Sequence, residues 1–177
     1  YITSRYDTTT GEFIPLERRI GLLDRKLRIV NENTSTSTDW LEAAQDAYRS
    51  IYAYEWQGDS LLLAREAMLY TFIENYQMKF RKMPQEKSIR FIAYIISWNV
   101  WQMDGLKRVV PDSCHDELVS ELFGEVERKK CKGCVTGKHD EHNGEYCLIK
   151  DWFHKDPVTK KYGVNITYHS LLGGTSV

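Results

Sequence analysis

The sequence predicts an α/β fold in which a partial Rossmann-like sheet carries helices and a small zinc-knuckle insertion. Two short apolar runs, each ending in an acid, predict strands over 51–56 and 99–104. Apolar residues recur at three- and four-residue steps over 60–82 and 85–98, which predicts two helices between these strands. A strand–helices–strand order is typical of a right-handed crossover in a parallel sheet. A group of cysteines and histidines follows and predicts the metal-stabilised insertion.

The length of 177 residues suits one domain, or one domain with a small appendage. We expect an N-terminal hairpin and helix plus the Rossmann-like portion over 1–110, the zinc-knuckle insertion over 111–150, and strands over 151–177 that return to the sheet. The chain begins at Tyr1 rather than at a methionine, so we expect a piece of a longer polypeptide.

Composition and charge narrow the class of protein. The formal net charge of -1 argues against a strongly basic nucleic-acid module, although local basic patches remain compatible with it. No apolar run is long enough to cross a bilayer, and no signal peptide is visible. We therefore expect a soluble, cytoplasmic protein with no membrane partner.

The N-terminal part of the sequence predicts a hairpin and two helices. The turn residues of 7–12 predict a hairpin, and apolar residues on one face predict a helix over 16–30. A polar loop over 31–38 precedes a helix that begins at Thr38 or Asp39 and runs to about Arg49. The basic face of the first helix either meets phosphates or is simply solvated; it consists of Arg18, Arg19, Arg25, Lys26 and Arg28.

The C-terminal part contains weaker signals. Leu118, Val119, Leu122 and Phe123 predict at most a short helix within a polar, acidic stretch. A third strand is predicted over 146–153 and a last one over 162–172, with a turn that begins at Asp156-Pro157 between them.

Three residues form a candidate cofactor site. Glu55 ends the first strand and Asp104 ends the second, and ligands bind outside the carboxyl ends of strands in open α/β sheets. One carboxylate would bind the ribose hydroxyls of a nucleoside, and the other would accept from its exocyclic amine. Trp56 could lie against the purine face. The alternative is a buried strand with an ordinary exposed Glu.

The cysteine-rich segment predicts a structural zinc site, because thiolate and imidazole ligands at close spacing suit tetrahedral zinc. Four protein ligands leave no open position for catalysis. His139 competes with His142, which we prefer because His-Asn-Gly supplies a tight turn. Cys114 stands apart and is predicted to be a lone thiol, and a redox Cys-x-x-Cys or free thiols are the other interpretations. The predicted ligands are Cys131, Cys134, His142 and Cys147.

Several of these motifs resemble adenine-specific (N6) DNA methyltransferases of restriction–modification systems, in a subgroup described as restriction endonuclease subunit M. The matching stretches are Ser50-Ile51-Tyr52-Ala53-Tyr54-Glu55 with Asp59 and Ala64-Arg65, the strand that ends at Asp104, and the Cys-x-x-Cys…His-Asn-Gly-x-Tyr-Cys knuckle. The resemblance implies S-adenosylmethionine as cofactor, held by Glu55 and Asp104, and methyl transfer to a flipped adenine of double-stranded DNA.

The departures from this family are equally informative. The glycine-rich loop that wraps the methionine part of the cofactor and an Asn-Pro-Pro-Tyr-like tetrapeptide are both missing from the sequence. The resemblance therefore implies that this chain supplies adenosine-binding acids and zinc but no catalytic residue. We expect it to be inactive without the remainder of a methyltransferase chain.

Two other interpretations stay open. One is a non-enzymatic zinc-knuckle module, phage-derived, that binds protein or DNA. The other is a helical structural protein in which the two predicted strands are not strands.

Overall fold

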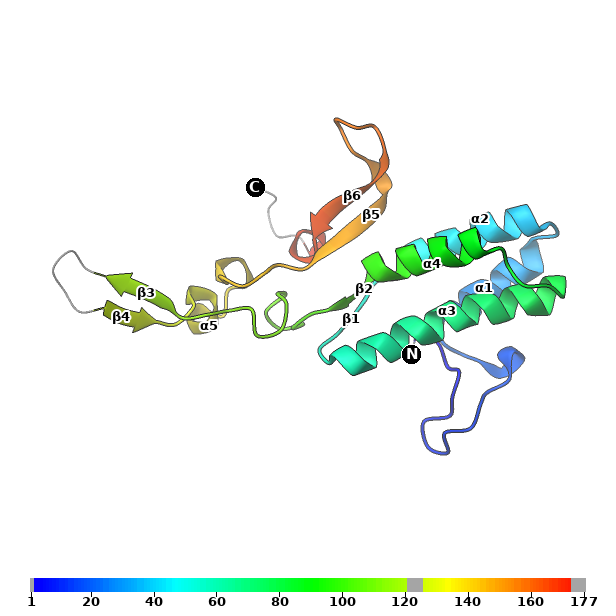
Figure 1. The fold of residues 1–177 in the computed structure, drawn as a ribbon, viewed down its shortest axis with the longest axis horizontal. Helices are drawn as coiled ribbons and strands as arrows, with labels where there is room; N and C mark the ends of the chain where they lie inside the picture. Colours follow the sequence, from blue (N-terminus) through cyan, green and yellow to red (C-terminus); the bar gives the residue numbers. More distant parts are fainter. Residues whose placement is uncertain (1, 121–125, 173–177) are drawn as a thin grey trace. The chain divides into compact units, whose positions relative to one another are not determined.

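The computed structural model describes residues 2–120 and 126–172, and these divide into two compact units (Figure 1). Unit 1 comprises Tyr1–Ala53 and Asp59–Val100, and unit 2 comprises Tyr54–Gly58 and Trp101–Val177. The described part is a mixture of helices and small sheets, as the sequence predicts in outline. The boundaries between units differ from the predicted division at 110 and 150.

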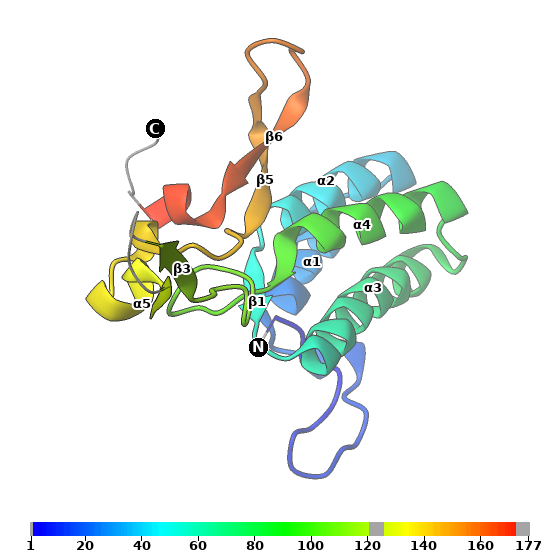
Figure 2. The same cartoon turned by 60° about the vertical axis from the view of Figure 1, so that its left-hand side comes forward.

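Unit 1 contains four helices, shown in Figure 2. They are α1 (Leu22–Asn33), α2 (Ser37–Arg49), α3 (Gly58–Phe80) and α4 (Glu86–Asn99). The last three agree closely with the predicted helices. Their core is aromatic and aliphatic because the apolar positions recur at helical spacing; its fully buried members include Leu23, Leu27, Trp40, Tyr48, Phe72, Met68, Ile92 and Ile95.

The predicted helix over 16–30 is divided in two. A short 3-10 helix, η1 (Leu16–Arg18), precedes α1. Between them Arg19 is 1% exposed, because its guanidinium donates to Ile14 O and pairs with Glu74. Drawing this cation into the interior bends the chain out of the helical path. The predicted N-terminal hairpin is confirmed by an antiparallel bridge between Tyr6 and Phe13.

Strands β1 (Ala53–Glu55) and β2 (Val100–Gln102) form a two-stranded sheet, as the predicted adjacency requires. Both are shorter than predicted. Within unit 1, the Arg65 guanidinium donates twice to Val100 O, at 3.0 and 2.6 Å, and so connects α3 to the start of β2. All three sheets formed by the described residues are two-stranded, so a larger Rossmann-like sheet stays a prediction.

Unit 2 contains two hairpins and the cysteine-rich segment. The first hairpin pairs β3 (Glu117–Ser120) with β4 (Val126–Lys129), and the second pairs β5 (Leu148–Lys155) with β6 (Tyr162–Thr167). The second hairpin is visible beside the label β5 in Figure 2. Short helices α5 (Lys132–Thr136) and η2 (His139–Glu141) lie between the hairpins, and η3 (Tyr168–Leu172) follows β6.

Two predictions for this unit need correction. The short helix predicted around Leu118 and Val119 is wrong, because these residues lie in β3 opposite Arg128 and Glu127; Leu122 and Phe123 lie outside the described residues. The last predicted strand ends at Thr167, where the chain turns into η3. In the described residues β5 and β6 pair with each other, and no further strand joins them.

Candidate metal centre

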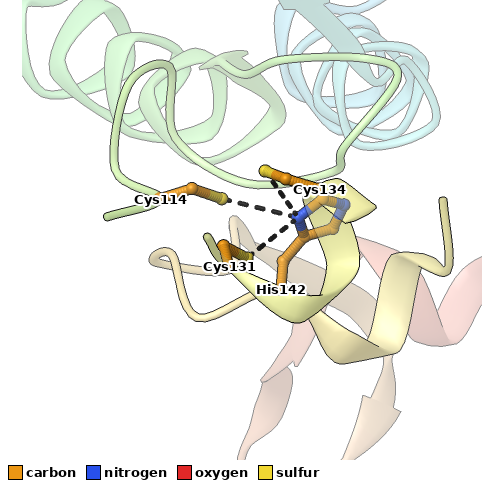
Figure 3. Close-up of side chains that lie close together, drawn as sticks. All are labelled: Cys114, Cys131, Cys134 and His142. Carbon is orange, nitrogen blue, oxygen red and sulfur yellow. Dashed lines mark hydrogen bonds between the residues drawn. The ribbon is translucent and has the colours of Figure 1, made fainter. Parts of the chain in front are cut away.

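Three cysteine sulfurs and one histidine nitrogen converge in unit 2 (Figure 3). The four ligand atoms of Cys114, Cys131, Cys134 and His142 all lie within 4.8 Å of one another. His142 Nδ1 lies 3.5 Å from Cys114 Sγ, 3.6 Å from Cys131 Sγ and 3.7 Å from Cys134 Sγ. Cys131 and His142 are buried, Cys114 is half-buried and Cys134 is exposed, so the cluster lies at the surface with two of its ligands covered.

These three contacts cannot all be hydrogen bonds. An imidazole nitrogen carries either one proton or one lone pair, so it forms one such bond at a time. A tetrahedral zinc ion, with Zn–S of about 2.3 Å and Zn–N of about 2.0 Å, would separate sulfur and nitrogen ligands by about 3.5 Å. The observed distances match this tetrahedral edge. The group could therefore hold a metal ion such as zinc.

Local structure brings Cys131 and Cys134 together. Cys131 is the N-cap of α5, and Cys134 lies within that short helix. The amide of Asn143 donates to Cys131 Sγ at 3.3 Å. Amide donors to a ligand sulfur orient the ligand and disperse its charge, as is usual around metal sites.

Two glycines allow the segments to approach. A Cβ on Gly133 would lie 2.6 Å from His142 N and 2.7 Å from its Nδ1. A Cβ on Gly144 would lie 2.5 Å from Ser113 Oγ and 3.1 Å from Cys114 Sγ. Both positions therefore need glycine for the four ligands to meet. The Lys132-Gly133 spacer of the Cys-x-x-Cys thus has a steric role.

Cys114 reaches the cluster through pairing between two distant segments. The Asn143 side chain donates to His115 O at 2.8 Å and accepts from His115 N at 3.2 Å, as a neighbouring strand would. One residue before Cys114, Ser113 Oγ accepts from Glu145 N at 3.0 Å. Together these bonds position Cys114 against His142.

The predicted ligand set changes in one member. The structure brings Cys131, Cys134 and His142 together as predicted, but the fourth residue is Cys114 rather than Cys147. Cys147 is buried, and its Sγ lies 3.6 Å from Gln102 O. Burial raises the pKa of Cys147 to about 11, so it is a protonated core thiol. The sequence held a usable signal, because Cys147 precedes the apolar residues of a strand while Cys114 has polar neighbours.

The alternative ligand His139 lies outside the cluster. Its carbonyl accepts from the Tyr146 hydroxyl at 2.7 Å, and the same hydroxyl accepts from His142 N at 3.1 Å. Tyr146 thus fixes the turn that presents His142.

The pKa values of Cys114 and Cys131 are shifted in opposite directions. Burial, followed by the nearby sulfurs of Cys131 and Cys134, raises the pKa of Cys114 to about 11. Burial also opposes ionisation of Cys131, but the amides of Asn143 and Cys134 and the His142 ring lower the pKa of Cys131 to about 6. Opposite shifts are expected where like charges share a site. A divalent cation between the sulfurs would remove that conflict.

The candidate cofactor residues also lie in unit 2. Met103 N donates to Glu55 O at 3.0 Å, so the ends of β1 and β2 are neighbours. Asp104 is 4% exposed, and its Oδ1 accepts from the amides of Leu106 and Lys107 at 2.9 and 3.1 Å. Trp56 is half exposed. The Asp104 carboxylate therefore holds a turn, a function that the sequence analysis did not anticipate.

No protein-family model, curated protein or solved structure matches the chain. Among the described residues, no helix has both the length and the apolar character that crossing a membrane requires.

Proposed function

We propose that unit 2 is a non-enzymatic zinc-knuckle module that binds duplex DNA through the hairpin formed by β5 and β6. The convergence of Cys114, Cys131, Cys134 and His142 at the base of a lysine-rich hairpin carries this proposal. Four protein ligands complete a tetrahedral zinc shell, which suits a structural site.

The metal cluster is connected directly to the base of this hairpin. Val110 N donates to Glu145 O at 2.8 Å within the segment pair that positions Cys114. One residue beyond Tyr146, Cys147 O accepts from Tyr168 N at 2.8 Å, immediately after β6. The Tyr146 ring also lies edge-on to His169, with 6.5 Å between ring centroids. Metal binding would therefore stiffen both strands at their base.

The tip of the hairpin is basic and aromatic. Lys155, Lys160 and Lys161 are exposed, as are Phe153 and Tyr162. Lys155 Nζ lies 4.8 Å from the centroid of the Tyr162 ring. Lysines neutralise phosphates, and a two-stranded ribbon fits the major groove of B-form DNA.

The two acids of the hairpin are occupied by local bonds. Asp156 Oδ1 accepts from the amides of Val158 and Thr159 at 2.9 and 2.6 Å, and these bonds lower its pKa. Asp151 accepts from the amides of Phe153 and His154 and contacts the His154 ring. Both acids therefore stay ionised, and the four lysines and two aspartates of 148–167 leave the hairpin with a formal net charge of +2.

Fluorescence anisotropy with a labelled 20-base-pair duplex tests the DNA proposal. We expect the logarithm of the binding constant to fall linearly with the logarithm of the salt concentration. Each lysine whose phosphate contact is removed should reduce the magnitude of this slope by about one. The test variant replaces Lys155, Lys160 and Lys161 by Gln, and the matched control replaces three exposed cations of unit 1, Arg25, Lys82 and Lys87. An equal loss in both variants, or no binding by the zinc-loaded chain, would reject the hairpin as a DNA site.

A second candidate is retained from the sequence: this chain as part of an S-adenosylmethionine-dependent N6-adenine DNA methyltransferase. The neighbouring ends of β1 and β2 favour it, because Glu55 is the last residue of β1 and Asp104 lies two residues after β2 in the same unit. Calorimetric titration of S-adenosylmethionine into the full-length protein and its Glu55→Ala and Asp104→Ala variants tests this candidate. Unchanged affinity in both variants would remove it.

A further inference from the structure

The sulfur ligands of the candidate metal centre differ in their access to solvent. Cys134 is exposed, whereas Cys114 is half-buried and Cys131 is only 2% exposed. A dissolved oxidant therefore meets Cys134 before it meets the other two sulfurs. In the metal-loaded chain this sulfur is a thiolate, because zinc holds its cysteine ligands deprotonated, and the thiolate is the reactive form of cysteine.

Cys131 is well placed to form a disulfide with an oxidised Cys134. Cys131 is the N-cap of α5 and Cys134 lies within this helix, three positions further along the chain. Residues at this spacing lie on the same side of a helical turn, with Cα atoms about 5 Å apart, which is within the range that a disulfide spans. The two sulfurs lie within 4.8 Å of each other. Side-chain rotation without a rearrangement of the backbone can therefore join them.

The fourth cysteine of the chain lacks both features. Cys147 is 2% exposed, and its Sγ lies 3.6 Å from Gln102 O, outside the group of ligands. It has neither a metal to ionise it nor access to solvent. An oxidant should therefore distinguish Cys134 from Cys147.

We propose that Cys134 and Cys131 form a peroxide-sensitive dithiol that releases the metal when it is oxidised. The Cys134 thiolate attacks one oxygen of the peroxide, the O–O bond breaks, and a sulfenic acid and hydroxide are formed. The Cys131 thiolate then attacks the Cys134 sulfur, an S–S bond forms, the S–O bond breaks, and a second hydroxide leaves. The two electrons that the sulfurs lose reduce the peroxide.

The disulfide removes two of the four metal ligands. Only Cys114 and His142 remain, and two protein ligands are too few for a closed tetrahedral zinc site. Reduction regenerates both thiolates, so the chain can bind zinc again. Control of DNA binding by this step rests on the proposed function, in which the metal stiffens the base of the hairpin formed by β5 and β6.

Treatment of the full, zinc-loaded chain with hydrogen peroxide tests the dithiol. A weak chromogenic chelator measures released zinc, and peptide mass spectrometry after alkylation locates the disulfide. We expect release of one zinc per chain, a disulfide between Cys131 and Cys134, and alkylated Cys114 and Cys147. A phosphine reductant should then restore zinc binding.

Two variants identify the reactive thiol. Cys134→His keeps four metal ligands but has no thiol at the exposed position, so peroxide should release zinc at least about tenfold more slowly than from the unaltered chain. Cys147→Ser is the matched control and should release zinc at the unaltered rate. If Cys134→His does not bind zinc, the position of the disulfide in the unaltered chain decides the question.

Three outcomes would overturn the proposal: retention of zinc in excess peroxide, a disulfide that excludes Cys134, or equal release rates from Cys134→His and the unaltered chain. A chain that binds no zinc before oxidation would reject the proposed function, and this inference with it. Release of zinc without a change in affinity for duplex DNA would overturn only the control of DNA binding.

Discussion

Unit 1 is stabilised by large apolar side chains between helices, whereas unit 2 has few such side chains and a group of metal ligands instead. In unit 1, Trp40, Tyr48 and Phe72 are completely buried, and the Phe72 ring contacts the rings of the other two. Around the knuckle of unit 2, the buried groups include the ligands Cys131 and His142, with Val109 and Cys147 among the few apolar side chains beside them. Where a segment cannot build a core, the free energy of metal binding can replace it.

Removing the metal should give the largest difference in stability between the two units. Structural zinc sites contribute about 10–16 kcal/mol in small zinc-finger peptides, so a strong chelator should unfold the cysteine-rich segment. Hydrogen exchange measured by mass spectrometry should show loss of amide protection over 109–147. Protection in α1 to α4 should persist. Loss of protection in both units together would contradict the proposed difference.

The two disputed cysteines allow a sharper test. Cys114→Ser should lower zinc affinity more than about 100-fold, the upper range for loss of an outer-shell partner, because it removes a ligand itself. Cys147→Ser should retain one zinc per chain, since Cys147 Sγ lies beside Gln102 O. Metal content by mass spectrometry and competition with a chelating dye provide the measurement. The reverse order of effects would restore the ligand set predicted from sequence.

A third prediction changes the apolar core of unit 1 and leaves the metal ligands of unit 2 unaltered. Phe72→Ala should lower the free energy of unfolding by about 3–5 kcal/mol, because it opens a cavity beside Trp40, Tyr48 and Tyr76. Zinc content should not change. Thermal melting followed by circular dichroism reports the first quantity, and elemental analysis reports the second. Loss of zinc in this variant would mean that the metal site depends on the helical core.

The smallest expected effect concerns the spacer of the Cys-x-x-Cys. Gly133→Ala should weaken zinc binding by about tenfold, since the new Cβ would meet the His142 backbone. Gly137→Ala is the control: Gly137 has φ of 74° with open space around its Cβ position, so the change strains α5 without touching a ligand. Equal zinc affinities in the two variants would show that the close approach is unimportant.

The sequence predicted the parts of the fold that depend on local pattern. Helices α2, α3 and α4 bury one face each, so apolar spacing located them. The ribbon of β3 and β4 was misassigned because none of the residues 117–119 and 127–129 is buried, so no alternation is imposed there: Leu118, for example, is 67% exposed. Apolar periodicity predicts secondary structure only where one face of the helix or strand is buried.

The sequence likewise predicted only the ligands of the metal centre that are close together in the chain. Cys131, Cys134 and His142 are close in the chain, so spacing alone identified them. Cys114 joins them through the bonds of Asn143 to His115, which are contacts between distant segments and leave no trace in spacing.

The position of Cys114 has a consequence for engineering the chain. Cys114 and Cys131 bracket the ribbon of β3 and β4, and both contribute to the metal-binding group. The metal would therefore clamp the two ends of this ribbon at one point. Its length and sequence could then be exchanged for those of a foreign peptide, which makes this insertion a natural place to graft an epitope or a fluorescent reporter while the clamp below it stays intact.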